Sequence, residues 1–341
     1  MAFPILSGQD TIYGRKPQTT WGTAVVTAFN TAASGFQFPA EPIDLSLGVK
    51  RREGKQAWGT RAQYNTSLQY DEKGVLPEFA LSGVATKQTL AEIFYSIFQS
   101  VAEGASTPFS KTFNWHATQP DFHANAGFFE TFALRFPSAS THHLVKDVIT
   151  KSLTLTCKVS DGRLMYSAQM IGRGAVTVNN NIATSEFALR AETYLYYHDL
   201  VRTTINVNAA GVITLPILAD GFEITIEKVV DGAGQSTGQF QSLATATYRV
   251  KGKLHIAKGA TFETILTGFK SNHEVDINLA WGSGTAGTVD GDLDFTIHGK
   301  ITDIKVDNKE VLGAEITFEG VKTASVQDVT VILADAVDRA W

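Results

Sequence analysis

The sequence predicts a mainly β protein, a β-sandwich with a short flanking helix, in which one supersecondary unit is used twice. In the stretch Val75 to Phe94, an alternating strand and a glycine lead into a short amphipathic helix that begins at Thr86 and is expected to turn Leu90, Ile93 and Phe94 inward. In the stretch Val250 to Phe269 the same features return, and the helix begins at Thr261, 175 residues later (261 − 86). The composition agrees, since 29 Gly and 21 Phe, with many Thr and Val, favour strands over helices.

A closing hairpin follows each unit. Leu153 to Met170 and Ile301 to Phe318 are each predicted to form two alternating strands around a polar turn, Asp161-Gly162-Arg163 in the first and Asp307-Asn308-Lys309 in the second. Strand, helix and hairpin in the same order twice predict an internal duplication. The alternative is that this order recurs by chance, as it can in α+β proteins.

The length of 341 residues suits two domains or one large β domain, and 43% apolar with 18% charged residues is typical of a globular chain. The single cysteine, Cys157, cannot form an internal disulfide, and its place in an alternating run predicts a buried hydrophobe. No apolar run has the length of a membrane span, and the first residues lack the pattern of a secretion signal. We therefore expect a soluble protein, synthesised in a cytoplasm, with no membrane partner.

The net charge of −5 is unevenly distributed along the chain. Residues 201–341 hold 12 Lys and Arg against 18 Asp and Glu, a net of −6, which leaves +1 for residues 1–200. An acidic protein is a poor candidate for gripping nucleic acid, because neutralised phosphates supply most of that affinity. It could still enclose nucleic acid without holding it.

Residues 1–40 are expected to form an extended N-terminal arm. They hold scattered aromatic residues, including Tyr13 and Trp21, but no sustained period of 2 or 3.6. A segment of this composition buries itself poorly, yet it is too aromatic for a disordered tail. It either orders against a neighbouring subunit or forms a meandering strand on its own domain.

Residues 41–200 are predicted to form the first domain, which opens with a hairpin that carries a basic loop. Ile43 to Val49 and Tyr64 to Tyr70 alternate as half-buried strands, and Asp71 to Gly74 is predicted as the turn that follows. The charged loop is expected at the hairpin's tip, where it projects into solvent or into a partner with its basic residues Lys50, Arg51, Arg52 and Lys55.

The helix of the first unit is predicted from about Thr86 to Val101, with Gly104 as its stop signal. The segment 105–147, which contains an alternating strand from Phe128 to Phe136, has no counterpart of similar length in the second copy. A linker over residues 201–219 then leads to the second domain, residues 220–341. Around the second copy this domain is expected to contain a strand, a glycine-rich loop and a last strand, at Phe222 to Ile226, Asp231 to Gly238 and Val326 to Leu333.

No catalytic constellation, metal site or cofactor motif is present, and we expect neither an enzyme nor a cofactor. Four histidines in the segment 105–147 are irregularly spaced, which favours a polar surface loop over zinc: His116, His123, His142 and His143. The run Asp290 to Asp294 is similar to a calcium loop, but Ile301 stands where the bidentate Glu is required. A turn into a strand from Leu293 to Ile301 is the favoured interpretation.

Four stretches together carry a resemblance to a known family. They are Tyr13 to Ala24, the strand with its basic loop from Ile43 to Lys55, the strand–Gly–helix unit from Phe79 to Phe98, and the hairpin from Leu153 to Gly172. In these stretches the chain resembles the major tail tube protein of long-tailed (siphovirus-like) bacteriophages. The resemblance covers most of residues 12–198 and, through the repeat, more loosely residues 220–333; the segment 105–147 departs from it.

The resemblance implies two tandem tail-tube-like β-sandwich domains in a structural protein of the virion tail. Such proteins polymerise into stacked rings whose inner sheets join into a barrel, and DNA passes through the lumen during ejection without specific binding. The partners implied are further copies of the chain, a tape measure protein, and tail terminator or tail tip proteins. Contacts between rings or subunits are expected at the basic loop and the arm: Lys50, Arg51, Arg52, Lys55, Trp21 and Tyr13.

Two matters stay open at this point. If both halves form tube wall, three chains build a pseudo-hexameric ring, which the repeat favours; if the second half is an outer decoration, six chains are needed. A carbohydrate-binding or adhesin β-module is the alternative function, with Trp58, Trp115 and Trp281 as an exposed sugar platform, and a hydrolase with an unrecognised site is a further one.

Overall fold

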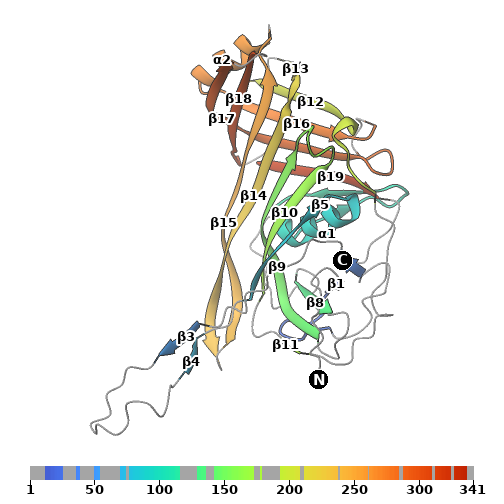
Figure 1. Ribbon diagram of the computed structural model, residues 1–341, viewed down its shortest axis with the longest axis vertical. Coiled ribbons are helices and arrows are strands. Elements are labelled where there is room, and N and C mark those ends of the chain that lie inside the picture. The colour runs from blue at the N-terminus through green and yellow to red at the C-terminus, as the bar shows by residue number, and fades with distance from the viewer. Residues whose placement is uncertain are drawn as a thin grey trace, which may run out of the picture.

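A computed structural model gives the architecture of the chain. It describes residues 12–25, 36–38, 50–53, 70–73, 77–115, 129–135, 142–172, 177–178, 193–207, 211–236, 239–259, 261–283, 287–308, 312–323 and 326–335. The described part is mainly β, with two α-helices, as the sequence predicts (Figure 1).

One antiparallel sheet, here called the broad sheet, runs through both halves of the chain. Its strand order is β5-β10-β9-β14-β15-β18-β17. Apolar side chains alternate with polar ones along these strands, so one face is buried and the other is polar. The strands are β5 (Glu78–Val84), β9 (His142–Cys157), β10 (Leu164–Ile171), β14 (Ile217–Ser236), β15 (Gln239–Ala257), β17 (Leu293–Asn308) and β18 (Leu312–Gly320).

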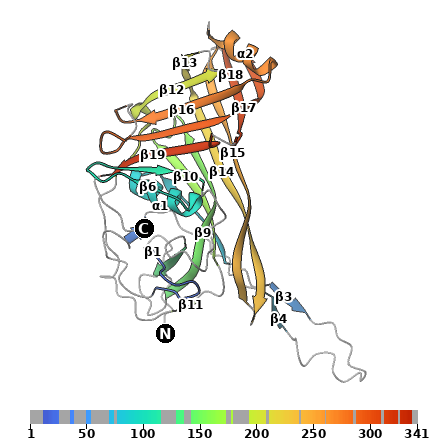
Figure 2. The same cartoon turned by 180° about the vertical axis from the view of Figure 1, so that it is seen from behind.

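A second sheet, the cross sheet, runs across the direction of β14 and β15 (Figure 2). Its order is β13-β12-β16-β17-β19-β7-β6. The first half of β17 belongs to the cross sheet and the second half to the broad sheet, with a register shift between Ile301 and Asp303. The further strands are β6 (Ala102–Glu103), β7 (Phe109–Phe113), β12 (Leu200–Val207), β13 (Val212–Thr214), β16 (Glu274–Trp281) and β19 (Val329–Asp335).

A small sheet has the strand order β2-β1-β8-β9-β11. It contains the first half of β9, whereas the second half of β9 belongs to the broad sheet, as β17 is divided between two sheets. Its other strands are β1 (Ile12–Pro17), β2 (Phe36–Phe38), β8 (Glu130–Arg135) and β11 (Thr177–Val178). A separate hairpin of β3 (Lys50–Glu53) and β4 (Tyr70–Lys73) extends away from the body (Figure 1).

Helix α1 (Lys87–Phe98) lies in the core between the sheets. Thr86 caps its N-terminus by accepting a hydrogen bond from the Thr89 backbone N–H at 3.1 Å, which confirms the predicted start. The predicted end at Val101 was wrong, because Gln99 adopts a left-handed conformation with φ 55° and stops the helix. All twelve residues are buried, so the expected one-sided apolar face is also corrected.

The second helix, α2 (Phe262–Lys270), begins after Thr261 as predicted. It lies at the far end of the broad sheet and contacts β17 and β12 (Figure 1). Unlike α1 it is amphipathic: Phe262, Ile265 and Gly268 are buried, whereas its remaining side is half-buried or exposed.

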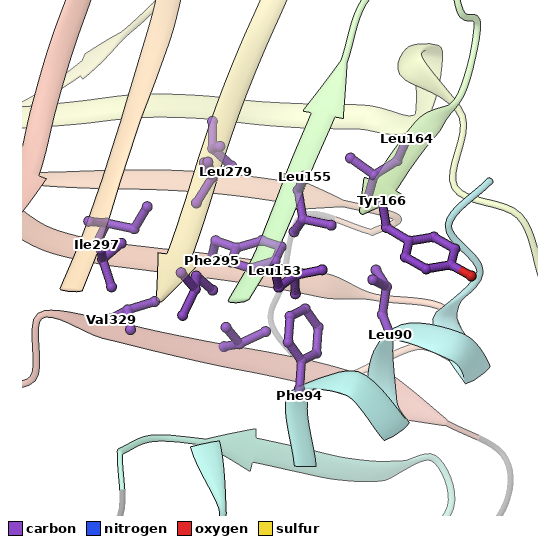
Figure 3. Packing of buried hydrophobic residues seen from close by; sticks show 14 of the residues in the cluster. Leu90, Phe94, Leu153, Leu155, Leu164, Tyr166, Leu279, Phe295, Ile297 and Val329 are labelled. Atoms are coloured by element: carbon purple, nitrogen blue, oxygen red, sulfur yellow. The ribbon is translucent and has the colours of Figure 1, made fainter. Parts of the chain in front are cut away.

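One continuous apolar core joins the two halves of the chain. Phe94 of α1 packs against Phe113 of β7 and Phe295 of β17, with ring centroids 5.6 Å apart in both pairs. Leu153 and Leu155 of β9 face the same helix (Figure 3). The segment that the sequence marks as a linker, residues 201–219, forms β12 and β13 inside the cross sheet.

The same pairing order occurs in each half. The order β2-β1-β8-β9-β11 in the first half is matched by β13-β12-β16-β17-β19 in the second. The hairpin β9–β10 pairs back with β5, and the hairpin β17–β18 pairs back with β15. Both predicted closing hairpins are present, although Asp307 and Asn308, expected in the second turn, lie in β17.

Two segments that the sequence assigns to loops are strands. The glycine-rich run from Asp231 to Ser236 continues β14 and pairs with β15, so the two strands form a long ribbon. Asp71 to Lys73, predicted as a turn, belongs to β4. In both cases backbone pairing with a partner strand outweighs the turn preference of Gly and Asp.

Candidate assembly site

The basic run lies in a strand and not at the tip of a loop, which corrects the prediction. Lys50 to Glu53 form β3 and pair with Tyr70 to Lys73 of β4, with Arg51 opposite Glu72 and Arg52 opposite Asp71. These two facing positions are opposite in charge, whereas Lys50 stands opposite Lys73. Among the described residues, the other edge of β3 has no strand beside it. Lys55 lies outside the described residues.

The N-terminal segment packs on its own chain, at least from residue 12 to residue 25. β1 pairs with both β2 and β8, and Tyr13 is 4% exposed and stacks on Phe132, with ring centroids 6.2 Å apart. Of the two predicted alternatives, a strand on its own domain describes these residues. Tyr13 is therefore unsuited to a contact with a neighbour.

A buried ion cluster fixes β1. The Arg15 guanidinium donates to both carboxylate oxygens of Glu130, from Nε at 2.7 Å and from Nη2 at 2.6 Å, and a further nitrogen meets Glu92 of α1. All three side chains are 3% exposed. Bidentate pairing offsets the large cost of removing these charges from water. Sequence patterns miss this cluster, because its members are far apart in the chain.

The turn after β1 is also held in place. The Gln18 side-chain amide donates to the Asp147 carboxylate at 2.9 Å and accepts the Asp147 backbone N–H at 2.7 Å. The same carboxylate accepts the backbone N–H of Gly22 at 2.8 Å. Trp21 meets Phe129 edge-on, with ring centroids 4.9 Å apart, and stays half-buried. Of the two aromatic residues expected to contact a neighbour, only Trp21 keeps an accessible surface.

The polar face of the broad sheet carries paired charges across β14, β15 and β18. Lys251 of β15 lies 3.0 Å from Glu227 of β14, and Arg249 of β15 lies 2.7 Å from Glu319 of β18. Lys253 is 4.0 Å from Glu315. Each basic side chain of β15 thus has a carboxylate on a neighbouring strand, so the face presents little unbalanced positive charge.

The polar face over β5, β10 and β9 is uncharged at its centre. Small hydroxyl and amide side chains alternate there with the buried apolar ones: Ser82, Ser152, Thr154, Thr156, Ser167 and Gln169. The hydroxyls of Thr154 and Thr225 lie 3.2 Å apart where the first half of the chain meets the second. The centre of this half is therefore hydrophilic and uncharged, and Glu78 of β5 and Lys151 of β9, 4.0 Å apart, add one charged pair at its end.

Asp292 and Cys157 both have structural roles. Burial opposes the charged form of Asp292, but backbone hydrogen bonds from Ser283 and Val289 and hydroxyl bonds bring its pKa below the ordinary value. The carboxylate thus closes the turn that leads into β17 at Leu293, as predicted. Burial raises the pKa of the Cys157 thiol to about 12, which confirms a buried hydrophobe.

No group of three or more His, Cys, Asp or Glu side chains suited to a metal occurs within the described ranges. His142 and His143 fall in β9, and His116 and His123 lie outside the described residues. Nor is either helix long and apolar enough to cross a membrane, over the same residues.

Two of the three tryptophans proposed for a sugar platform are buried. Trp115 and Trp281 are 2% and 1% exposed and belong to the core, and Trp58 lies outside the described residues. The alternative function in carbohydrate binding thus loses two of the three aromatic residues named for it.

Lys228 is a further buried cation that the sequence did not predict. The Lys228 ammonium, on β14, donates to the backbone carbonyl of Ser96 in α1 at 2.9 Å. Burial lowers the pKa of Lys228 to about 7, against a smaller opposing effect of Glu130. In sequence this residue sits in an ordinary alternating strand, so no local signal marks it.

Comparison with known proteins adds no identification. No family model matches the chain, and no curated protein matches it. The function must therefore be argued from the surfaces described above.

Proposed function

We propose that this chain is the major tail tube protein of a long-tailed bacteriophage, a structural protein whose rings stack into a hollow tube for DNA ejection. The observation that carries the proposal is the broad sheet. It is a seven-stranded antiparallel sheet with one polar face. At its two sides, β5 and the second half of β17 have open edges among the described residues. Open edges invite pairing with another chain, and a closed ring removes them.

The polar face suits the wall of a lumen. DNA affinity comes mainly from basic groups that neutralise phosphates. On this face Lys251 and Arg249 are already paired with Glu227 and Glu319, and the strands of the first half offer hydroxyl groups. Such a wall lets DNA slide past without specific binding.

The repeated pairing order supports a duplicated chain with two wall units. Three chains would then provide six wall units in one ring. A hexamer with the second half as decoration is less favoured, because β9 and β14 already join both halves in one sheet. The partners proposed are further copies in stacked rings, a tape measure protein, and tail terminator or tail tip proteins, in the virion tail.

Electron microscopy of the purified protein at high concentration tests the proposal. We expect rings or hollow tubes, and three-fold rotational symmetry in a cross-section of one tube. Six chains per ring would reject the trimer alone. A protein that stays monomeric at every concentration and salt condition would reject the assembly role itself.

A further inference from the structure

Strand β14 leaves the broad sheet just beyond Glu227. Its pairing with β9 ends there, opposite Ser152, and among the described residues it then pairs with β15 alone. A register shift between Lys228 and Val230 lies at this point. Beyond it the two strands continue as the long ribbon (Figure 1 and Figure 2). Residues 228–230 are therefore the base of the ribbon.

Two side chains hold this base against the rest of the protein. The Lys228 ammonium donates to the Ser96 carbonyl, in the last turn of α1, at 2.9 Å. Val230 is 5% exposed and lies in a small apolar cluster whose other members are Phe129, Ile149 and Ile171. Val229, between the two, is 54% exposed. Solvent is thus one residue away from a buried lysine.

The surroundings of Lys228 suit a neutral amine better than an ammonium ion. A protonated lysine carries three N–H donors. Within the described part of the chain, the Ser96 carbonyl is the one hydrogen-bond acceptor that Lys228 reaches, and Lys228 forms no ion pair there. A buried cation with so few partners is costly. Burial accordingly lowers the pKa of Lys228 to about 7, and Glu130 opposes this effect only in part.

The carboxylates near Lys228 are already engaged by another cation. Glu130 of β8 accepts hydrogen bonds on both carboxylate oxygens from Arg15 of β1, and Arg15 also meets Glu92 of α1. These three side chains carry a net charge of −1, which attracts an ammonium ion from a distance. Neither carboxylate can turn to Lys228 without leaving Arg15.

The other titratable groups on the neighbouring elements do not change charge near neutral pH. Tyr248 of β15 stands opposite Lys228, and Tyr95 of α1 borders the Arg15 cluster. Burial raises the pKa of both phenols, to about 12 for Tyr95, so both stay neutral up to pH 9. On β9, Lys151 lies 4.0 Å from Glu78 and is 42% exposed.

We propose that Lys228 is a proton-dependent hinge at the base of the ribbon. The neutral amine docks on the Ser96 carbonyl and keeps the base on α1. When the amine takes up a proton from water, the ammonium turns past Val229 into solvent and the base is released. Acidification therefore favours release. The proposal concerns the single chain and goes beyond the proposed function, so either can fail while the other stands.

Hydrogen exchange of the unassembled full chain tests the hinge. The peptide covering residues 228–231 is followed by mass spectrometry, and its rates are divided by the intrinsic exchange rate at each pH to give the opening constant. The pKa of Lys228 is about 7 when docked and 10.5 ordinarily. The opening constant should thus be about fifty times larger at pH 7 than at pH 9, and only about twofold larger again at pH 6.

Two lysine variants separate this site from other protons. Lys228→Met removes the titrating group, so its opening constant should change by less than about threefold between pH 7 and pH 9. Lys251→Met is the matched control, because Lys251 of β15 is 43% exposed and lies 3.0 Å from Glu227. This control should keep the fifty-fold change of the original protein.

Three results would overturn the hinge. The first is an opening constant in the original protein that does not depend on pH. The second is an equal effect of pH on the peptide covering residues 329–335 of β19, because the proton would then act on the whole fold. The third is a fifty-fold change that persists in Lys228→Met, which would assign it to another group. The first two need no variant and decide the matter even if Lys228→Met does not fold.

Discussion

Replacing Arg15 with leucine tests how strongly the N-terminal strand is built into the fold. The change leaves Glu92 and Glu130 buried at 3% exposure without their cation. Breaking a buried pair in this way costs about 3–5 kcal/mol. For 341 residues the unfolding entropy is about 0.7 kcal/mol/K, so the melting temperature should fall by roughly 4–7 °C.

Arg249→Leu is the matched control, because Arg249 pairs with Glu319 at 2.7 Å but is 54% exposed. An exposed pair contributes about 0–1 kcal/mol, so the control should melt within about 1.5 °C of the original protein. Both variants are measured by calorimetry on unassembled protein. Equal melting of the two variants would refute the reasoning, since β1 would then be held by something other than its buried ion cluster.

Three further results are expected. Deleting residues 1–38 removes β1 and β2 and should sharply lower the melting temperature. A soluble product with an unchanged melting temperature would instead support an N-terminal arm that orders against a neighbouring subunit. The pKa of Lys228 is about 7 in the folded protein and 10.5 ordinarily, so between these pH values the unfolded chain binds one proton more than the folded protein. The free energy of unfolding should therefore rise from pH 7 to pH 9. Lys228→Met should abolish that rise in denaturant titrations. Gly221→Ala should lower the melting temperature of the protein far more than Gly162→Ala. Both glycines have positive φ, but a Cβ added at Gly221 would lie 1.6 Å from the Cys157 carbonyl oxygen, whereas a Cβ added at Gly162 would meet nothing within 4 Å.

The sequence predicts the elements whose causes are local. Thr86 and Thr261 mark the helix starts because a capping residue and an apolar period occur together there. The alternation of β9 with β10 and of β17 with β18 reflects one buried and one polar sheet face, which a period of 2 records directly.

The candidate surfaces depend on distant partners and were predicted less well. The segment Ile12 to Pro17 shows no apolar alternation, because a charged residue, Arg15, occupies one of its buried positions. Carboxylates from α1 and β8 balance the charge of Arg15, and both are distant in sequence. Helix α1 was expected to keep an exposed side, but β7 and β19 from elsewhere in the chain cover it. The basic run at Lys50 was recognised as a surface of interest, but its strand conformation comes from pairing with β4.

The burial of α1 has a consequence for the order in which the protein is made. Phe94 packs on Phe295, and β7 is paired by β19, which ends at Asp335 near the end of the chain. On the ribosome, the helix emerges more than two hundred residues before that cover is synthesised. Domains that fold as units during synthesis bury their apolar surface soon after it emerges. The first half of this chain cannot bury α1 by itself, because part of the cover comes from β17 and β19. The aromatic side chains of α1 therefore stay uncovered, and prone to aggregation, until β19 has been synthesised.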